Sequence, residues 1–207
     1  MPADLQTPDE VLEHLKDGNE RFVRGEPRFA VVCKEKLADL ARAQRPYATI
    51  VGCSDSRVAP ELIFDAGLGE LFIIRVAGNV ISREVMGSLQ YAAVHLGTPL
   101  FVVLGHEGCG AVTAALDAIH RGVQQQSHIQ HLLDTIIPGL VGIEPGLAAD
   151  EELQRGVEAN VRWSMAQIMA TPGVKARAAK GKMKLVGAVY EIATGRVRFL
   201  PAAPQGA

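Results

Sequence analysis

What this 207-residue sequence lacks excludes several classes of protein. Its 21 basic and 23 acidic residues give a formal net charge of −2, without the basic excess that marks nucleic-acid-binding domains. Its longest apolar runs, such as 100–104, are far too short to span a bilayer. The first seven residues have neither the cationic start nor the apolar core of a signal peptide. We therefore expect a cytoplasmic protein that binds neither nucleic acid nor membrane.

Cysteine is equally scarce, with Cys33, Cys53 and Cys109 as the three in the chain. An odd and sparse set cannot form a disulfide framework, and it indicates a reducing compartment and a metal-binding or catalytic use. We expect Cys33 to be a passive core or surface residue. The 48% hydrophobic and 21% charged residues are typical of a globular domain and exclude a mainly disordered chain.

The N-terminal 45 residues are predicted to form a helical arm. Thr7 and Glu10 have the spacing of a capping box, and apolar residues then recur at helical intervals until Gly25 and Pro27 end the helix. A second helix is expected over 34–43. We assign residues 1–207 to a single domain, with 1–45 as the arm, 46–200 as the α/β core and 201–207 as a tail.

Beyond the arm, short runs rich in Val, Ile and Leu alternate with helical segments. This alternation predicts a mostly parallel sheet flanked by helices, with about four parallel strands and an antiparallel edge strand. The expected strands are 47–52, 71–76, 100–104, 184–190 and, at the edge, 197–200. The expected helices are 82–96, 110–120, 127–137 and 151–169, with a short one starting near Pro60. Helix 127–137 is expected to break at Pro138, and helix 151–169 to end at 171–173.

Two short segments carry chemistry. Residues 53–57 (CSDSR) follow the first predicted strand, and 106–110 (HEGCG) follow the third. The carboxyl ends of parallel strands meet at one edge, so Cys53, His106 and Cys109 should converge there. Two thiolates and one imidazole suit a catalytic zinc site, which leaves one position for water. Cys109 precedes a predicted helix start, so we expect its thiol pKa to be lowered. Taken singly, either cysteine would be an ordinary core residue.

The first segment also contains an acidic residue, Asp55, and a basic residue, Arg57. Asp55 is either a fourth metal ligand or, held bidentately by Arg57, an acceptor that orients a metal-activated water. Without a metal the pair would be a loop salt bridge. His128 and His131, three apart on a predicted helix, are a weaker alternative metal site or a proton relay.

At these residues the sequence closely resembles the β-class carbonic anhydrases. The segments GCSDSR (52–57) and HEGCGAV (106–112) match that family's two signatures in order and spacing. The stretches 69–80 and 88–99 are also similar, and the resemblance covers about residues 7–200.

The resemblance implies one zinc ion per subunit, held by Cys53, His106 and Cys109, with Asp55 and Arg57 as a catalytic dyad. It implies a carbonate dehydratase, a zinc lyase that reversibly hydrates CO₂ to bicarbonate and a proton. In that reaction a zinc-bound hydroxide, oriented by the dyad, attacks CO₂.

The resemblance also implies a substrate-binding set: Gln44, Phe72, Ala77, Gly78 and Tyr91. Gln44 would offer its amide to substrate, and the two aromatic residues would line a narrow apolar CO₂ pocket. In the family the neighbouring subunit contributes part of this wall, and N-terminal helices embrace the partner. We therefore expect a homodimer or a homotetramer built as a dimer of dimers.

One departure bears on the state of the site. A subset of the family, inhibited by bicarbonate, binds the dyad aspartate to zinc and has a tryptophan three residues before the first zinc cysteine. Here that residue is Ile50, although Arg75 matches the subset's arginine. We therefore expect Asp55 to pair with Arg57 near neutral pH. Three other functions stay open: hydrolysis of COS or CS₂, non-catalytic zinc binding, and thiol redox or metal sensing, which the absence of a C-x-x-C motif disfavours.

Overall fold

A computed structural model describes residues 7–28 and 34–201 and confirms the predicted α/β architecture. Five strands form one sheet in the order β2-β1-β3-β4-β5, parallel except for the antiparallel pairing of β5 with β4. The strands are β1 (Ala48–Gly52), β2 (Leu71–Arg75), β3 (Leu100–His106), β4 (Lys184–Tyr190) and β5 (Val197–Phe199). Cys33 and residues 202–207 lie outside the described residues.

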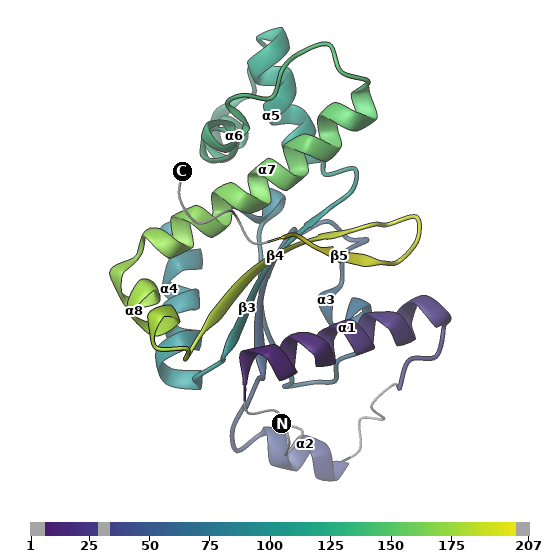
Figure 1. Cartoon of the computed structure of the whole chain (residues 1–207), viewed down its shortest axis with the longest axis vertical. Coiled ribbons are helices and arrows are strands. Elements are labelled where there is room, and N and C mark those ends of the chain that lie inside the picture. Colours follow the sequence, from purple (N-terminus) through teal and green to yellow (C-terminus); the bar gives the residue numbers. More distant parts are fainter. Residues whose placement is uncertain (1–6, 29–33, 202–207) are drawn as a thin grey trace.

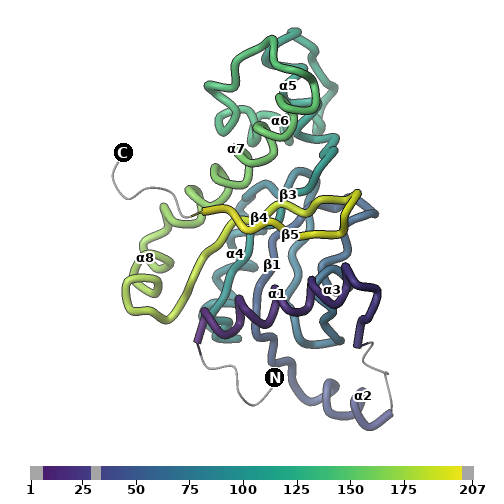
Figure 2. Tube along the Cα trace, turned by 45° about the vertical axis from the view of Figure 1, so that its right-hand side comes forward, coloured from purple at the N-terminus to yellow at the C-terminus, as the bar shows by residue number. Residues whose placement is uncertain are grey.

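Helices cover both faces of the sheet (Figures 1 and 2). On one face lie α1 (Pro8–Arg24) and α3 (Pro60–Ile63). The opposite face carries α4 (Arg83–Tyr91), α5 (Gly110–Arg121), α6 (Ser127–Leu140), α7 (Ala149–Ala170) and α8 (Pro172–Ala179). Helix α2 (Lys34–Leu40) buries none of its residues. None of the helices in the described ranges is long and apolar enough to cross a membrane.

The alternation of side chains along the strands creates two hydrophobic cores. Ile50 and Val102 point to the α1 face, while Val51 and Val103 point to the face of α4–α8. Successive strand side chains face opposite sides, so uninterrupted apolar runs fill both layers. This explains why the central strands β1 and β3 are buried along their whole length.

Helix α1 begins and ends as predicted. The Thr7 hydroxyl accepts from the Glu10 amide, the Glu10 carboxylate accepts from the Thr7 amide, and Gly25 closes the helix at φ 70°. The buried Asn19 ties α1 to the core, because its amide group donates to the carbonyls of Ile63 and Gly195. The first helix of the predicted arm therefore packs on its own core.

Several predicted boundaries were wrong. Helix α2 ends at Leu40 rather than residue 43, and α4 gives way after Tyr91 to a π-helical turn, Ala92–Leu96. Helix α8 was not predicted. Pro172 ends α7 but also begins α8, because a proline at the first position of a helix gives up no backbone hydrogen bond.

The predicted break at Pro138 was also wrong, because α6 continues to Leu140. Proline removes one helical hydrogen bond and crowds the preceding turn. Trp163 of α7 packs against this turn: its indole N–H donates to the Thr135 carbonyl at 3.0 Å, next to the Asp134 carbonyl that Pro138 cannot serve. Gly139 lies close to the same side chain, where an added Cβ would be 2.4 Å from the Trp163 Cβ. Packing against α7 thus keeps the helix intact.

Candidate metal centre

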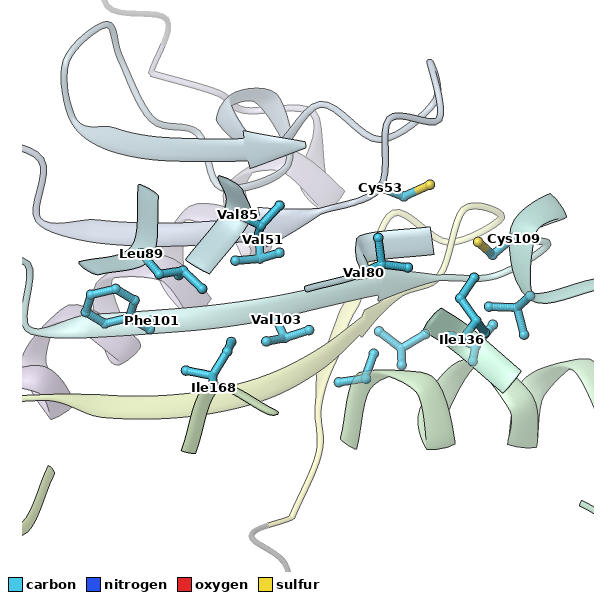
Figure 3. Close-up of a cluster of buried hydrophobic side chains, with 14 of the residues drawn as sticks. Val51, Cys53, Val80, Val85, Leu89, Phe101, Val103, Cys109, Ile136 and Ile168 are labelled. Atoms are coloured by element: carbon cyan, nitrogen blue, oxygen red, sulfur yellow. The ribbon is translucent and has the colours of Figure 1, made fainter. Parts of the chain in front are cut away.

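The sheet topology brings the two predicted segments together. Strands β1 and β3 are parallel neighbours, and Gly52 pairs with Leu104. Cys53 follows the end of β1, His106 is the last residue of β3, and Cys109 is the N-cap of α5. Figure 3 shows both thiols at the same end of the hydrophobic cluster, beyond Val51 and Val103.

The three side chains form a group that could hold a metal ion. Their ligating atoms, two Sγ and one ring nitrogen, all lie within 4.8 Å of one another, and all three residues are buried. His106 Nδ1 lies 2.8 Å from the Glu107 carbonyl, which can only accept, so the proton is on Nδ1. The lone pair is then on Nε2, a buried atom without a hydrogen-bond partner in the described part of the chain. This is the arrangement of a metal-ligating histidine.

The two thiols shift each other's pKa in opposite directions. Hydrogen bonding with Cys109, which outweighs burial, lowers the pKa of Cys53 to about 4. The same hydrogen bond, together with burial, raises the pKa of Cys109. The nearby amides of α5 do lower the pKa of Cys109, as the helix start predicts, but the contact with Cys53 and burial raise it more. A divalent cation touching both sulfurs would stabilise both thiolates, so the donor set fits zinc.

Asp55 lies beside this group of three side chains in a fixed orientation. Arg57 donates through its backbone N–H and Nε to one oxygen at 2.9 Å, and through Nη2 to the other at 2.7 Å. These hydrogen bonds hold the pKa of the Asp55 carboxyl well below its usual range. The second oxygen lies 3.9 Å from His106 Nε2. An ionised carboxylate therefore faces the ligand group while Arg57 occupies both of its oxygens.

Other residues hold the two loops in place. Arg75 at the end of β2 donates to the backbone carbonyl of Cys53 at 2.9 Å and to that of Asp55 at 2.6 Å. Arg57 also reaches the Gly108 carbonyl, at 3.4 Å, and so links the loops. Sequence reasoning gave Arg75 no positioning role. The available signal was that β2 neighbours β1, where Arg75 pairs with Gly52.

The predicted substrate-binding residues fall into two groups. Gly78 lies at the ligand group, because its amide donates to Cys53 Sγ at 3.3 Å, and Ala77 is adjacent to it. Gln44 is exposed and precedes β1, at the far end of the strand from Cys53. Phe72 and Tyr91 contact each other at a ring separation of 6.2 Å, and Phe72 pairs with Thr49 near the start of β1.

The alternative metal site finds no support in the structure. His128 and His131 are both exposed on α6, and neither belongs to a metal-ligating group within the described ranges. Cys53 and Cys109 are core residues by burial, but both sulfurs also face His106.

A two-thiolate, one-imidazole group at the carboxyl edge of a parallel sheet defines a zinc-dependent α/β enzyme. The sequence model of a family described as carbonic anhydrase matches residues 48–197. Carbonic anhydrase 2 of Mycobacterium tuberculosis is 45% identical over 184 residues, covering 88% of this chain and 87% of that protein. The chain belongs to the carbonic anhydrase family, zinc lyases that reversibly hydrate CO₂.

Further comparisons agree. A carbonic anhydrase of Mycolicibacterium smegmatis is 42% identical over 187 residues, covering 89% of each protein. The Coccomyxa beta-carbonic anhydrase in complex with acetazolamide is similar in structure, with a TM-score of 0.72, 27% identity, and coverage of 95% of this chain and 87% of that one. A tetrameric beta-carbonic anhydrase from Sordaria macrospora shares the fold, with a TM-score of 0.73, 22% identity, and coverage of 93% and 95%.

Proposed function

We propose that Cys53, His106 and Cys109 hold the zinc ion of this carbonic anhydrase, and that Asp55 and Arg57 are its catalytic dyad. The observation that carries the proposal is the juxtaposition of the ligand group with an ionised carboxylate, 3.9 Å from His106 Nε2. A purely structural zinc site would take a fourth protein ligand and would have no use for a carboxylate held by an arginine.

The dyad divides its work between the two residues. Zinc, when bound, acts as a Lewis acid that activates water at neutral pH. Asp55 accepts a hydrogen bond from the attacking water. This bond orients the water so that a lone pair on the water oxygen points toward CO₂. Arg57 keeps Asp55 ionised and, by occupying both carboxylate oxygens, keeps it from ligating the metal itself. Ala77 and Gly78 form the wall of the CO₂ site within the same chain.

Gln44, Phe72 and Tyr91 serve the centre of a neighbouring subunit in this proposal. Strand β1 is roughly 13 Å long and lies between Gln44 and Cys53 in the chain, so Gln44 is near the opposite end of the strand from its own centre. Tyr91, which contacts Phe72, is 47% exposed, and Val94, three residues further on, is 67% exposed. A second copy would cover these apolar side chains. We therefore propose a homodimer, with a dimer of dimers as the larger assembly.

We also propose the domain organisation, the role of the arm and the location that the sequence suggests. Residues 1–207 form one domain, because a single sheet collects every described strand and α1 packs on that sheet. Residues 1–45 contribute to the dimer, in keeping with the exposed α2. The protein works in the cytoplasm, a reducing compartment in which Cys53 and Cys109 stay unpaired and available as metal ligands.

The catalytic assignment is tested with Asp55→Asn. The amide keeps the shape of the side chain but accepts hydrogen bonds weakly and loses the charge that pairs with Arg57. We expect zinc content to stay at one ion per subunit while CO₂ hydration, followed by stopped flow, falls at least ~100-fold.

The matched control is Asp134→Asn, an exposed aspartate on α6 that should leave hydration unchanged. Full activity in Asp55→Asn would overturn the role of Asp55. Negligible hydration by the zinc-loaded parent protein would overturn the catalytic proposal itself, and COS hydrolysis measured alongside would then identify a sulfur-substrate hydrolase.

A further inference from the structure

The Cys53 sulfur accepts a hydrogen bond from a backbone amide outside its own loop. The Gly78 N–H lies 3.3 Å from Cys53 Sγ, and both residues are buried. Such a bond to a thiolate withdraws electron density from the sulfur, and it fixes the direction in which the sulfur faces. The position of Gly78 therefore bears on the ligand properties of Cys53.

The turn that carries this amide has an unfavourable backbone conformation. Gly78 has φ 66° and the next residue, Asn79, has φ 45°, so two successive residues are left-handed. That conformation costs little for glycine but more for asparagine, and it persists where the surroundings hold it. Gly78 has no room for a side chain, because a Cβ would lie 2.7 Å from the Ile136 side chain.

Two polar side chains of α7 hold this turn. Asn160 donates its amide to the Gly78 carbonyl at 2.8 Å, and Ser164 donates its hydroxyl to the Asn79 carbonyl at 3.1 Å. Asn160 is 1% exposed and Ser164 is fully buried. They lie four residues apart and so share one face of the helix. Buried polar groups on an otherwise apolar helix face are costly unless they make such bonds.

We propose that Asn160 and Ser164 are positioning residues for the metal centre, acting through the Gly78 amide on the Cys53 sulfur. By fixing two consecutive carbonyls, they hold the Gly78 N–H on Cys53 and set how strongly that thiolate donates to a metal. The inference rests on the proposed role of Cys53 as a zinc ligand. Residues that orient metal ligands typically change metal affinity or activity by about 10–100-fold when removed.

The first test uses the unaltered protein loaded with an NMR-active cadmium isotope. If the Gly78 amide donates to a metal-bound Cys53 sulfur, a scalar coupling between cadmium and the Gly78 amide proton is expected across the hydrogen bond. Couplings from cadmium to the Cys53 β-protons report separately that Cys53 is a ligand. Absence of the Cys53 couplings would refute the proposed metal centre, whereas their presence without the Gly78 coupling would refute this inference alone.

The second test compares the metal-binding properties of Asn160→Ala and Ser164→Ala with those of a control variant, Ile168→Ala. Ile168 is fully buried on the same helix but belongs to the apolar core, so its truncation lowers stability without touching the turn. In the cobalt-substituted protein we expect the thiolate-to-metal absorption band of both polar variants to move to lower energy. We also expect zinc to be released to a chelator about tenfold faster.

Ile168→Ala should leave both readouts at the parent values. Unchanged band positions and release rates in Asn160→Ala and Ser164→Ala would overturn the proposal, as would equal shifts in all three variants. If Asn160→Ala does not fold, Ser164→Ala, which removes a single oxygen atom, decides the question together with the cadmium coupling.

Discussion

Arg57 contacts Asp55 through its backbone N–H, Nε and Nη2. At the residue scale, this geometry is one that only a guanidinium provides, because it presents two parallel N–H groups to two oxygens. A lysine would offer a single point charge and would leave one carboxylate oxygen free. The orientation of Asp55 thus depends on the identity of one side chain.

We predict that Arg57→Ala retains zinc but loses at least ~100-fold in CO₂ hydration, because the freed carboxylate no longer has a fixed direction. Arg57→Lys should have intermediate activity. Stopped-flow hydration and zinc quantification on the same samples check this. Arg83→Ala, which removes an exposed arginine at the start of α4, is the control and should match the parent protein. Parental activity in Arg57→Ala would contradict the assigned role.

The convergence of the two cysteines and the histidine was predictable because it depends on a general rule, the meeting of strand ends at one sheet edge. Cys53, His106 and Cys109 follow from strand order and the loop sequences alone. The thiol pKa of Cys109 was not predictable, because it depends on a sulfur from another loop and on burial. Likewise the Gly78 amide reaches Cys53 only through a turn whose left-handed residues the hydrophobic pattern does not reveal.

At the scale of elements, the sequence predicted every strand within two residues, since runs of Val, Ile and Leu mark buried strands clearly. Besides the end of α2 and the π-helical turn after α4, the failures concern proline. Pro138 was expected to break α6 and Pro172 only to end α7, yet α6 continues and α8 begins. The continuation of α6 depends on tertiary surroundings, here the Trp163 indole, which local sequence rules do not include, whereas Pro172 simply occupies the first position of α8.

The contact between α6 and α7 leads to a paired prediction. Gly139→Ala would force a methyl group onto Trp163, so we expect the free energy of unfolding to fall by about 1–3 kcal/mol. Gly87→Ala, in the exposed interior of α4 with open space around it, should raise it by about 0.5–1 kcal/mol. Urea unfolding followed by circular dichroism distinguishes them. A change in the free energy of unfolding of the same sign in both variants would contradict the packing argument.

Asp65 predicts an acid dependence of stability. Burial raises the pKa of Asp65, but hydrogen bonds from Arg21 and Arg28 outweigh it, so the net pKa lies below the usual value. A depressed pKa means that the stabilisation is fully present above about pH 4 and is lost as the pH falls through the folded-state pKa. This contact stabilises the attachment of α1 to the segment that follows α3.

We therefore expect Asp65→Asn to lower stability by about 1–3 kcal/mol at neutral pH and to lessen the dependence of stability on pH below about 5. Asparagine also tolerates the left-handed backbone at this position, which has φ 46°. Thermal unfolding between pH 3 and 7 checks this, with the exposed Asp39→Asn as control. If the stability of Asp65→Asn fell as steeply with decreasing pH as that of the parent, the ionised Asp65 would not contribute to stability.

At the scale of the whole molecule, the proposed dimer makes a prediction that one chain alone cannot meet. If Gln44 acts in the neighbouring subunit, a heterodimer of Gln44→Ala and Asp55→Asn chains has one intact centre and one doubly altered centre. Mixed and reassembled chains should then regain up to about half of the parental activity per heterodimer. If Gln44 served its own chain, both centres would stay impaired.

Hydration rates of the refolded mixture, compared with each variant refolded alone, decide between these cases. Sedimentation of the mixture confirms that heterodimers have formed, and a mixture of Gln44→Ala with Asp134→Asn chains controls for dilution. No gain above the two separate variants would refute the shared centre.

The parallel pairing of β1 with β3 also has a consequence for the order of events during synthesis and folding. The two strands are adjacent in the sheet, but β2 and α4 lie between them in the sequence. Cys53 and His106 become neighbours only after this long loop has closed in the correct register, a slow, non-local step. Zinc binding at the proposed centre would therefore report the pairing of β1 with β3, and a zinc-sensitive dye present during refolding would measure when that pairing forms.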